Sequence, residues 1–467
     1  MGNEKIFRHF GIRYLDISTS RLLFNYELMK YILSLLLLTL SGLILAQEKL
    51  DSVGAIILDA DTGEPIQYAS VYVSPNCGTI SNDDGEFCLQ CLPSETIRIT
   101  CIGYKHITCQ ASELPSVIRM QPVSTMLKEV TVTHNRGDNI IYKLVEKMQR
   151  EAKKHRKAVS QYFFRMAIQY PGTDELAEAF MSAKSCVQIR DIIFHSGSRG
   201  QLQDGKVSGP SLTGLGRTNL HVFLRLSPVL VNYDIWGNAF VPADFAFHRI
   251  KDVYDISCVK LTEEDGTEIN KIRFSAHPAI ISHPVLDGTL YVDRKRCRLL
   301  RFDGQMHGLQ IVLYDQARDK YLYTSVNYTM HVDYRHDHGF TEISNMSDVI
   351  TKDSVKIRQL LYNIGDKKLQ FKNSVRVGKN MIHAIDMAGF DSTLWVANNI
   401  VKRTKEEERV VFKDTTFWSV NKSKYDTEVT EQEKNTNIYL KDAIRQLMNN
   451  TMQLQRTPPN VSRRKKK

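Results

Sequence analysis

The fold is decided by residues 54–104, which read GAIILDADTGEPIQYASVYVSPNCGTISNDDGEFCLQCLPSETIRITCIGY. Short apolar runs rich in Val, Ile and Tyr alternate there with turns that contain Asp, Gly or Pro, about one every ten residues. Within the runs the apolar side chains alternate, as Ile97 and Ile99 do around Arg98, which places them on one face of a strand. This pattern predicts a small antiparallel β-sandwich of the seven-stranded type over residues 51–132.

The order of the turns resembles a known domain. It runs through Asp61-Thr62-Gly63-Glu64-Pro65, Ser81-Asn82-Asp83-Asp84-Gly85 and Ile102-Gly103-Tyr104. The stretch resembles the carboxypeptidase-like regulatory domain, a transthyretin-like sandwich found in many exported proteins. That resemblance implies a non-catalytic module that binds or positions through loops at one end. Leu127–Val132 is predicted as its exit strand.

The N-terminal residues 1–46 are predicted to be a leader. Met29, the expected start, opens a short positive segment before an apolar run over residues 32–45, which Ala46 closes. This order is typical of a secretory signal peptide cut after Ala46. The alternative is a membrane anchor, but the run is shorter than the roughly 20 residues that span a bilayer. The protein is therefore expected to be exported, to the periplasm or the outer membrane.

The net charge of +10 does not indicate nucleic-acid binding. The leader, with eight charged residues of which five are basic, and the five basic residues 463–467 carry seven of these charges, which leaves +3 for the rest. A body so close to neutral has no expected phosphate-binding face. Residues 456–467 are predicted to be a disordered basic tail.

All eight cysteines follow the leader, and five lie in the predicted sandwich, namely Cys77, Cys88, Cys91, Cys101 and Cys109. Export permits disulfides, so one or two structural disulfides among small buried thiols are expected, with their pairing left open. Cys88 and Cys91 have the spacing of a redox pair, but they stand at the end of a strand rather than at a helix N-terminus. No second pair of matching spacing completes a zinc site.

A linking amphipathic helix is predicted over residues 138–157, with Asp138 as N-cap. An antiparallel β-rich domain is predicted over residues 158–364, joined by turns at 263–266, 303–304 and 336–339. Its expected strands are 162–168, 183–189, 252–261, 271–274, 287–293, 299–302, 321–334, 340–350 and 354–362. Such long strands must curl around a helix or their own twist, so a half-barrel is one expected form.

Two parts of this region are predicted to differ from plain sheet. Residues 196–244, which contain Gly and Pro, are expected to interrupt the sheet as a lid or packing element. Residues 365–455 are predicted to be partly helical, with helices at 391–401 and 437–452. The whole arrangement resembles an uncharacterised family of exported Gram-negative envelope proteins, and residues 287–302 also resemble the half-barrel of periplasmic lipoprotein carriers.

No catalytic, cofactor-binding or metal-binding residue is predicted. A zinc carboxypeptidase needs a His followed three residues later by Glu, and the chain has none. The sequence Ser196-Gly197-Ser198-Arg199-Gly200 lacks the first Gly of a nucleophile elbow. His331, His336 and His338 form the one local histidine cluster, for which a polar hairpin turn is favoured over a metal site.

The acidic turns also have a structural explanation. Asp59 with Asp61, and Asn82 with Asp83 and Asp84, lack the regular spacing and distal Glu of a calcium loop. Turn formation is therefore favoured over calcium binding.

Three functions remain as hypotheses. The first is a non-catalytic envelope protein, mainly β with some α, whose sandwich positions a sheet domain that holds a ligand or partner. The second is a lipid or lipoprotein carrier, which requires a curved sheet whose interior is not filled by its own side chains. The third is a hydrolase with an unrecognised site, which requires ionisable residues of shifted pKa clustered in a pocket. The expected partner is an envelope protein, a glycan or a lipid, not nucleic acid, and no cofactor is expected.

Overall fold

The structure is a computed structural model that describes residues 29–31, 50–123, 135–208 without 188, 204 and 205, 254–277 without 264, 286–315, 320–365, and 369–410 without 370, 378–380 and 399. The chain divides into two compact units, Met1–Asp51 and Ser52–Lys467. In the first unit, residues 29–31 are helical. The rest of the predicted leader and the predicted exit strand 127–132 lie outside the described residues. Within the described part of the chain, no helix is both long enough and apolar enough to cross a membrane.

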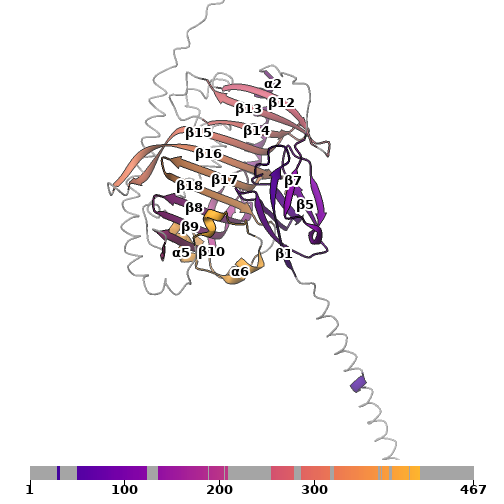
Figure 1. Cartoon of the computed structure of the whole chain (residues 1–467). Coiled ribbons are helices and arrows are strands. Elements are labelled where there is room, and N and C mark those ends of the chain that lie inside the picture. The colour runs from indigo at the N-terminus through magenta and orange to yellow at the C-terminus, as the bar shows by residue number, and fades with distance from the viewer. Residues whose placement is uncertain are drawn as a thin grey trace, which may run out of the picture. The chain divides into compact units, whose positions relative to one another are not determined.

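Seven strands in two sheets form the predicted sandwich (Figure 1). One sheet has the order β4-β1-β7 and the other the order β3-β2-β5-β6. The seven-stranded sandwich is thus confirmed. The strands are β1 (Asp51–Asp59), β2 (Ser70–Ser74), β3 (Cys77–Ile80), β4 (Glu86–Cys91), β5 (Thr96–Thr100), β6 (Ile107–Gln110) and β7 (Val117–Met120), with a 3₁₀ turn η1 (Ala111–Glu113) before β7.

The prediction that the sandwich is wholly antiparallel is wrong. β1 and β7 pair in parallel, with Ile56 opposite Val117. No hairpin joins these two strands, since the rest of the domain lies between them in the sequence, and only a tight hairpin forces neighbouring strands to run in opposite directions.

The Asp-Gly turn before β4 depends on its glycine. Gly85 has a φ of +75°, and a Cβ added there would lie 2.6 Å from the carbonyl oxygen of Ile57. Both facts exclude a larger residue without backbone rearrangement. Ile57 itself is fully buried in the sandwich core with Leu89, Ile97 and Ile99.

The linking helix α2 (Asn135–Lys154) begins three residues before the predicted start and ends three residues before the predicted end. Ile141, Leu144 and Met148, spaced three and four residues apart, are all buried in the core of the large sheet. The predicted amphipathic helix is confirmed, and its apolar face packs on the sheet.

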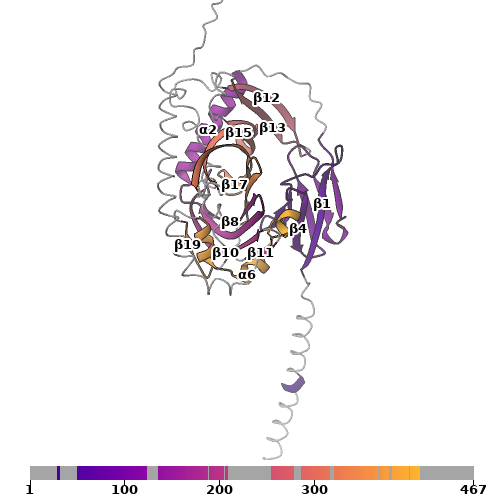
Figure 2. The ribbon, with the colours of Figure 1, turned by 60° about the vertical axis from the view of Figure 1, so that its left-hand side comes forward.

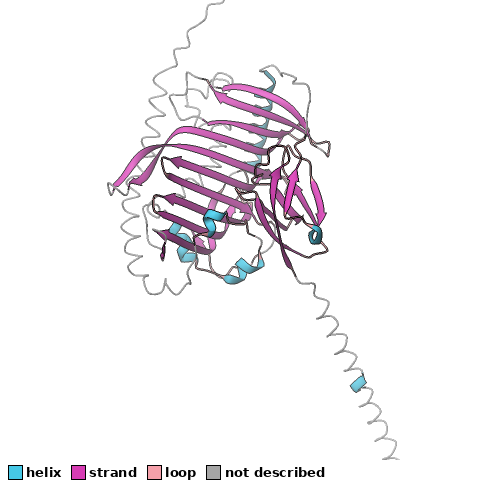
Figure 3. Ribbon diagram, in the orientation of Figure 1, coloured by secondary structure: helices cyan, strands magenta, loops and turns pink. Residues whose placement is uncertain are grey.

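The described strands after α2 form one large antiparallel sheet with the order β11-β10-β9-β8-β18-β17-β16-β15-β14-β13-β12, and β19 pairs with β10 (Figures 1 and 3). Figure 2 shows that its strands curve strongly. The strands are β8 (Val159–Tyr170), β9 (Thr173–Lys184), β10 (Arg190–Gln203), β11 (Lys206–Ser208), β12 (Tyr254–Thr262), β13 (Glu268–Ala276), β14 (Leu286–Asp293), β15 (Arg298–Asp315), β16 (Lys320–Arg335), β17 (Glu342–Lys352), β18 (Val355–Asn363) and β19 (Val375–Arg376). The predicted fold class, mainly β with a long antiparallel sheet, is confirmed.

Three predictions about this sheet are wrong. The predicted strand 183–189 does not extend past Lys184, where β9 ends, and the described residues 185–187 and 189 lie outside the named strands. The sequence pattern does not predict the earlier part of β9 because Glu, Leu, Ala and Met favour helix. The sheet is not interrupted at Ser196, since β10 continues to Gln203 and β11 follows; residues 209–244 lie outside the described residues. Asp303-Gly304 is not a turn, because β15 runs through it and pairs on both sides.

The described part of the C-terminal region contains short helices after β19. They are α5 (Met381–Ala388), α6 (Ser392–Ala397) and α7 (Lys405–Glu408). α6 falls within the predicted helix 391–401 but ends four residues earlier, and Asp391 is its N-cap rather than its first turn. The predicted helix 437–452 and the basic tail lie outside the described residues.

The face of the sheet that carries α2 is called the inner face here, and the opposite one the outer face. On the inner face, Phe164 and Phe302 belong to the same buried cluster as α2 residue Leu144 and α5 residue Ile385. α5 packs closely, since a Cβ on Gly197 would lie 2.5 Å from the carbonyl oxygen of Ile385. The protein's own side chains therefore fill the space on the inner face where α2 and α5 pack.

Candidate functional site

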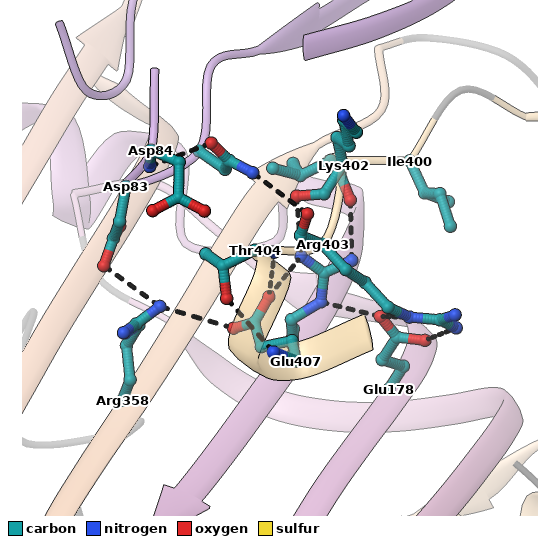
Figure 4. Close-up of polar contacts among 12 residues, drawn as sticks. Asp83, Asp84, Glu178, Arg358, Ile400, Lys402, Arg403, Thr404 and Glu407 are labelled. Carbon is teal, nitrogen blue, oxygen red and sulfur yellow. Dashed lines mark hydrogen bonds and ion pairs between the residues drawn. The ribbon is translucent and has the colours of Figure 1, made fainter. Parts of the chain in front are cut away.

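The sandwich contacts the outer face of the sheet through the turn over residues 81–86 (Figure 4). Asn82 shapes this turn, because its Oδ1 accepts hydrogen bonds from the backbone N–H groups of Asp84 and Glu86 at 3.0 and 2.9 Å. The carboxylates of Asp83 and Glu86 reach residues outside the sandwich. Asp83 lies 3.0 Å from Arg358 of β18, and Glu86 lies 2.5 Å from Lys402. Asn82 therefore has the predicted role in the turn, whereas Asp83 and Glu86 bond residues outside the sandwich.

The segment 400–410 lies between the turn and the sheet. Its Arg403 carbonyl accepts a hydrogen bond from Asn82 at 3.0 Å, and its Lys405 N–H donates to Asp84 at 3.2 Å. Helix α7 is held by a capping box, in which Thr404 and Glu407 bond each other's backbone N–H groups. One short segment thus binds the sandwich on one side and the sheet on the other.

Two sheet residues anchor this segment. Arg165 of β8 donates to the carbonyl oxygen of Val401 at 2.6 Å, and its Nε lies 2.6 Å from the Glu178 carboxylate of β9. Glu178 also receives two bonds from Arg403, at 2.6 and 3.1 Å (Figure 4). Arg165 is 2% exposed and Glu178 is fully buried, so water does not compete for the bond between these two side chains.

The electrostatics of this cluster are those of permanent ion pairs. Burial by itself raises the pKa of Glu178, but the guanidinium groups of Arg165 and Arg403 outweigh it and lower the pKa below its usual value. The Glu178 carboxylate therefore stays ionised beside the two guanidinium groups, which makes the cluster a structural lock rather than a proton-transfer site.

A second contact joins the sandwich to the middle of the sheet. The Tyr68 ring stacks on the His331 imidazole with centroids 4.8 Å apart. The Tyr68 hydroxyl donates to Asp83 at 2.7 Å and is hydrogen-bonded to Ser347 at 2.8 Å. The Ile102-Gly103-Tyr104 turn also takes part, since the Gly103 N–H donates to Glu263 at 3.2 Å.

Beneath Tyr68, His331 lies between two carboxylates. Its Nδ1 is 2.6 Å from Asp303 and its Nε2 is 3.0 Å from Asp333, which also receives Arg301 at 2.7 Å. Burial lowers the pKa of His331, but Asp333 and Asp303 outweigh it, so the pKa is raised. The imidazolium is an internal partner for these carboxylates.

The three histidines for which a polar hairpin turn was favoured over a metal site each have a separate partner. His331 bonds the two carboxylates, His336 bonds the carbonyl oxygen of Leu299 at 2.8 Å, and His338 lies 3.2 Å from Glu342. In the described residues, no group of three or more His, Cys, Asp or Glu side chains is arranged to hold a metal ion.

All eight cysteines are described and all are free thiols, so the expected structural disulfides are not present. Cys91, Cys101, Cys186 and Cys258 are buried, as small core side chains are expected to be. Burial is the main cause that raises the pKa of Cys186 to about 12, which makes it a poor nucleophile.

A groove of 420 Å³ crosses strands β13–β16. Its polar lining residues fall in two rows that the strand register places on one face, and the row between them directs its side chains to the other face. The first row is Arg273, Thr289 and Asp303; the second is Asp287, Gln305 and Thr329, with Ser275 beside them; the row between is Phe274, Gly288, Gly304 and Met330. Asp303 connects the groove to the His331 network.

Two other clusters bear on the hydrolase hypothesis. His195 lies 2.8 Å from the Ser182 hydroxyl, as in a nucleophile–base pair, but the Phe371 ring lies flat on the imidazole with centroids 3.6 Å apart. Buried Glu175 has its pKa raised to about 7, mainly by burial and against the attraction of Arg199. Neither cluster lines the groove over β13–β16.

Sequence reasoning missed Arg165, Glu178 and Arg403, which build the junction between the sheet and the segment 400–410. Arg165 interrupts the apolar run Phe163-Phe164-Arg165-Met166, and such a charge inside a predicted strand was the available signal for a buried ion pair. The partners Glu178 and Arg403 come from distant parts of the chain, and no local pattern connects them.

The comparisons with known proteins bear on the sandwich. Residues 54–132 match the CarboxypepD_reg-like domain family, which confirms the resemblance drawn from the turns. No curated protein matches the chain.

Three solved structures show weak likeness. A DUF1329 family protein from Desulfovibrio piger is 10% identical over 50% of this chain and 95% of its own, with a TM-score of 0.19. A putative outer membrane lipoprotein-sorting protein domain from Vibrio parahaemolyticus is 11% identical over 50% and 94%, with a TM-score of 0.17. MucB in complex with MucA(peri) is 8% identical over 47% and 92%, with a TM-score of 0.15. TM-scores this low carry no argument about this chain.

Proposed function

We propose that the chain is a non-catalytic, exported protein of the cell envelope, in which the sandwich is a positioning module and the sheet domain holds a ligand or partner. The observation that carries this proposal is that the sandwich turn 81–86 makes its polar bonds to other residues of the same chain. Asn82, Asp83 and Glu86 bond Arg403, Arg358 and Lys402, so this turn binds the segment 400–410 and the sheet rather than an outside partner.

The sheet offers a place for the ligand. The groove over β13–β16 has a volume of 420 Å³ and is lined in part by polar side chains, whereas Glu178, whose pKa is shifted, is buried and paired with two arginines. A hydrolase needs both features in one place. Only Asp303 of the His331 network lines the groove, so the geometry favours binding over catalysis.

The carrier hypothesis has less support. It requires an open apolar interior, and the described inner face is packed against α2 and α5. Export is supported by the leader pattern of residues 29–46, a positive segment followed by an apolar run and a small residue.

Cell fractionation tests the proposal. The full chain with a C-terminal tag is expected in the envelope fraction, as a product whose first residue is Gln47. The control is Leu37→Arg, which places a charge in the apolar run and is expected to leave the full-length product in the cytosol. Recovery of the unaltered chain in the cytosol with its leader attached would contradict the proposal.

A further inference from the structure

The groove over β13–β16 cannot bind a ligand through its backbone. Each of the four strands has a neighbour on both sides, so their N–H and C=O groups are used in the sheet. An extended peptide adds to a sheet at an edge, where these groups are open. A ligand in the groove is therefore recognised by side chains.

The polar side chains that line the groove include both hydrogen-bond donors and hydrogen-bond acceptors. Thr289, Thr329 and Ser275 each donate and accept, Gln305 does both through its amide, and Arg273 only donates. Asp287 and Asp303 accept as carboxylates. Among the groove-lining residues, two carboxylates stand beside one guanidinium, which disfavours a phosphate or another polyanion.

Both carboxylates are held in place by the protein. Asp303 Oδ1 is 2.6 Å from His331 Nδ1, and Asp287 Oδ1 accepts from the Ala276 N–H at 2.7 Å. Within the described residues, the second oxygen of each carboxylate has no protein partner in the structure. A fixed acceptor loses little freedom on binding, which favours a ligand with hydroxyl groups to donate.

We propose that this groove binds a neutral oligosaccharide, an inference that rests on the proposed function because it names the ligand of the sheet domain. A sugar chain presents many hydroxyl groups, each able to donate and to accept, and carries no charge to be repelled by Asp287 and Asp303. Its hydroxyls match the mixed lining of the groove.

Calorimetric titration of the purified chain with maltotetraose, cellotetraose and chitotetraose tests this inference, with tetragalacturonate as an anionic counterpart. At least one neutral probe is expected to bind, and tetragalacturonate is expected to bind more weakly. Arg273→Leu and Thr329→Val are each expected to weaken binding about tenfold, the effect of one lost hydrogen bond in a bound complex.

Matched controls come from the sandwich, where Arg98 and Thr108 are also exposed strand residues. Arg98→Leu and Thr108→Val are expected to leave binding unchanged. The inference is overturned if no neutral probe binds up to about 10 mM, if tetragalacturonate binds as well as the neutral probes, or if the control variants weaken binding equally. A chain that reaches the envelope but binds no probe contradicts only the ligand class, whereas a chain that binds a probe but stays in the cytosol contradicts only the proposed export.

Discussion

The junction around Glu178 and the groove over β13–β16 are both polar and both belong to the large sheet, yet they differ in burial and pairing. Glu178 is fully buried and bonds two arginines. The groove residues Arg273, Gln305 and Thr329 are exposed. Polar residues that are buried and fully paired hold a structure together, and those that are exposed and unpaired are available to a ligand. This difference separates the structural cluster from the candidate binding site.

The largest effect is expected when the junction is broken. Glu178→Gln keeps the shape but removes the charge that Arg165 and Arg403 share, and it leaves two cations with weaker partners. Loss of one member of a buried ion pair costs about 3–5 kcal/mol. Urea unfolding followed by circular dichroism measures the change in the free energy of unfolding.

The matched control for this change is Glu146→Gln. Glu146 pairs with Arg150 at 3.6 Å on the surface of α2, with both side chains more than two-thirds exposed. An exposed pair of this kind contributes about 0.5 kcal/mol or less. Equal destabilisation by the two variants would mean that burial does not distinguish the junction.

Glu175 is an intermediate case, since it is buried but incompletely paired. Burial is the main cause that raises its pKa from the ordinary 4.5 to about 7. A raised pKa contributes stability that is fully present below pH 4.5 and is lost as the pH rises through 7. Glu175→Gln does not ionise, so at pH 8 it is expected to be more stable than the unaltered chain by about 3 kcal/mol.

Unfolding curves at pH 4.5 and pH 8 test this expectation. The difference between Glu175→Gln and the unaltered chain is expected to grow with pH. A constant difference would show that the carboxyl is not neutral in the folded protein.

The smallest effect on stability is expected in the groove. Arg273→Leu removes an exposed side chain with no buried partner, so the free energy of unfolding is expected to change by less than about 0.5 kcal/mol. Thermal unfolding measures it beside Glu178→Gln. A large loss with Arg273→Leu would show that the groove belongs to the structural framework, which removes the distinction between the two regions.

The sequence pattern predicts the parts of the fold that short stretches determine. The sandwich follows from turns such as Asn82 to Gly85, where side-chain bonds and a positive φ act within a few residues. Helix α2 follows in the same way, because Ile141, Leu144 and Met148 repeat at helical spacing. These signals are local, so no knowledge of distant residues is needed.

Only the tertiary structure decided the rest. β9 is a strand despite its helix-favouring residues because β8 and β10 pair with it along its length. β15 passes through Asp303-Gly304 because Gly288 and Met330 pair with Gly304 on either side. The junction joins Arg165, Glu178 and Arg403, which are up to 238 positions apart in the sequence, and the groove joins residues of four strands. Such sites depend on strand register, and register is set by pairing between distant segments rather than by the residues of any one of them.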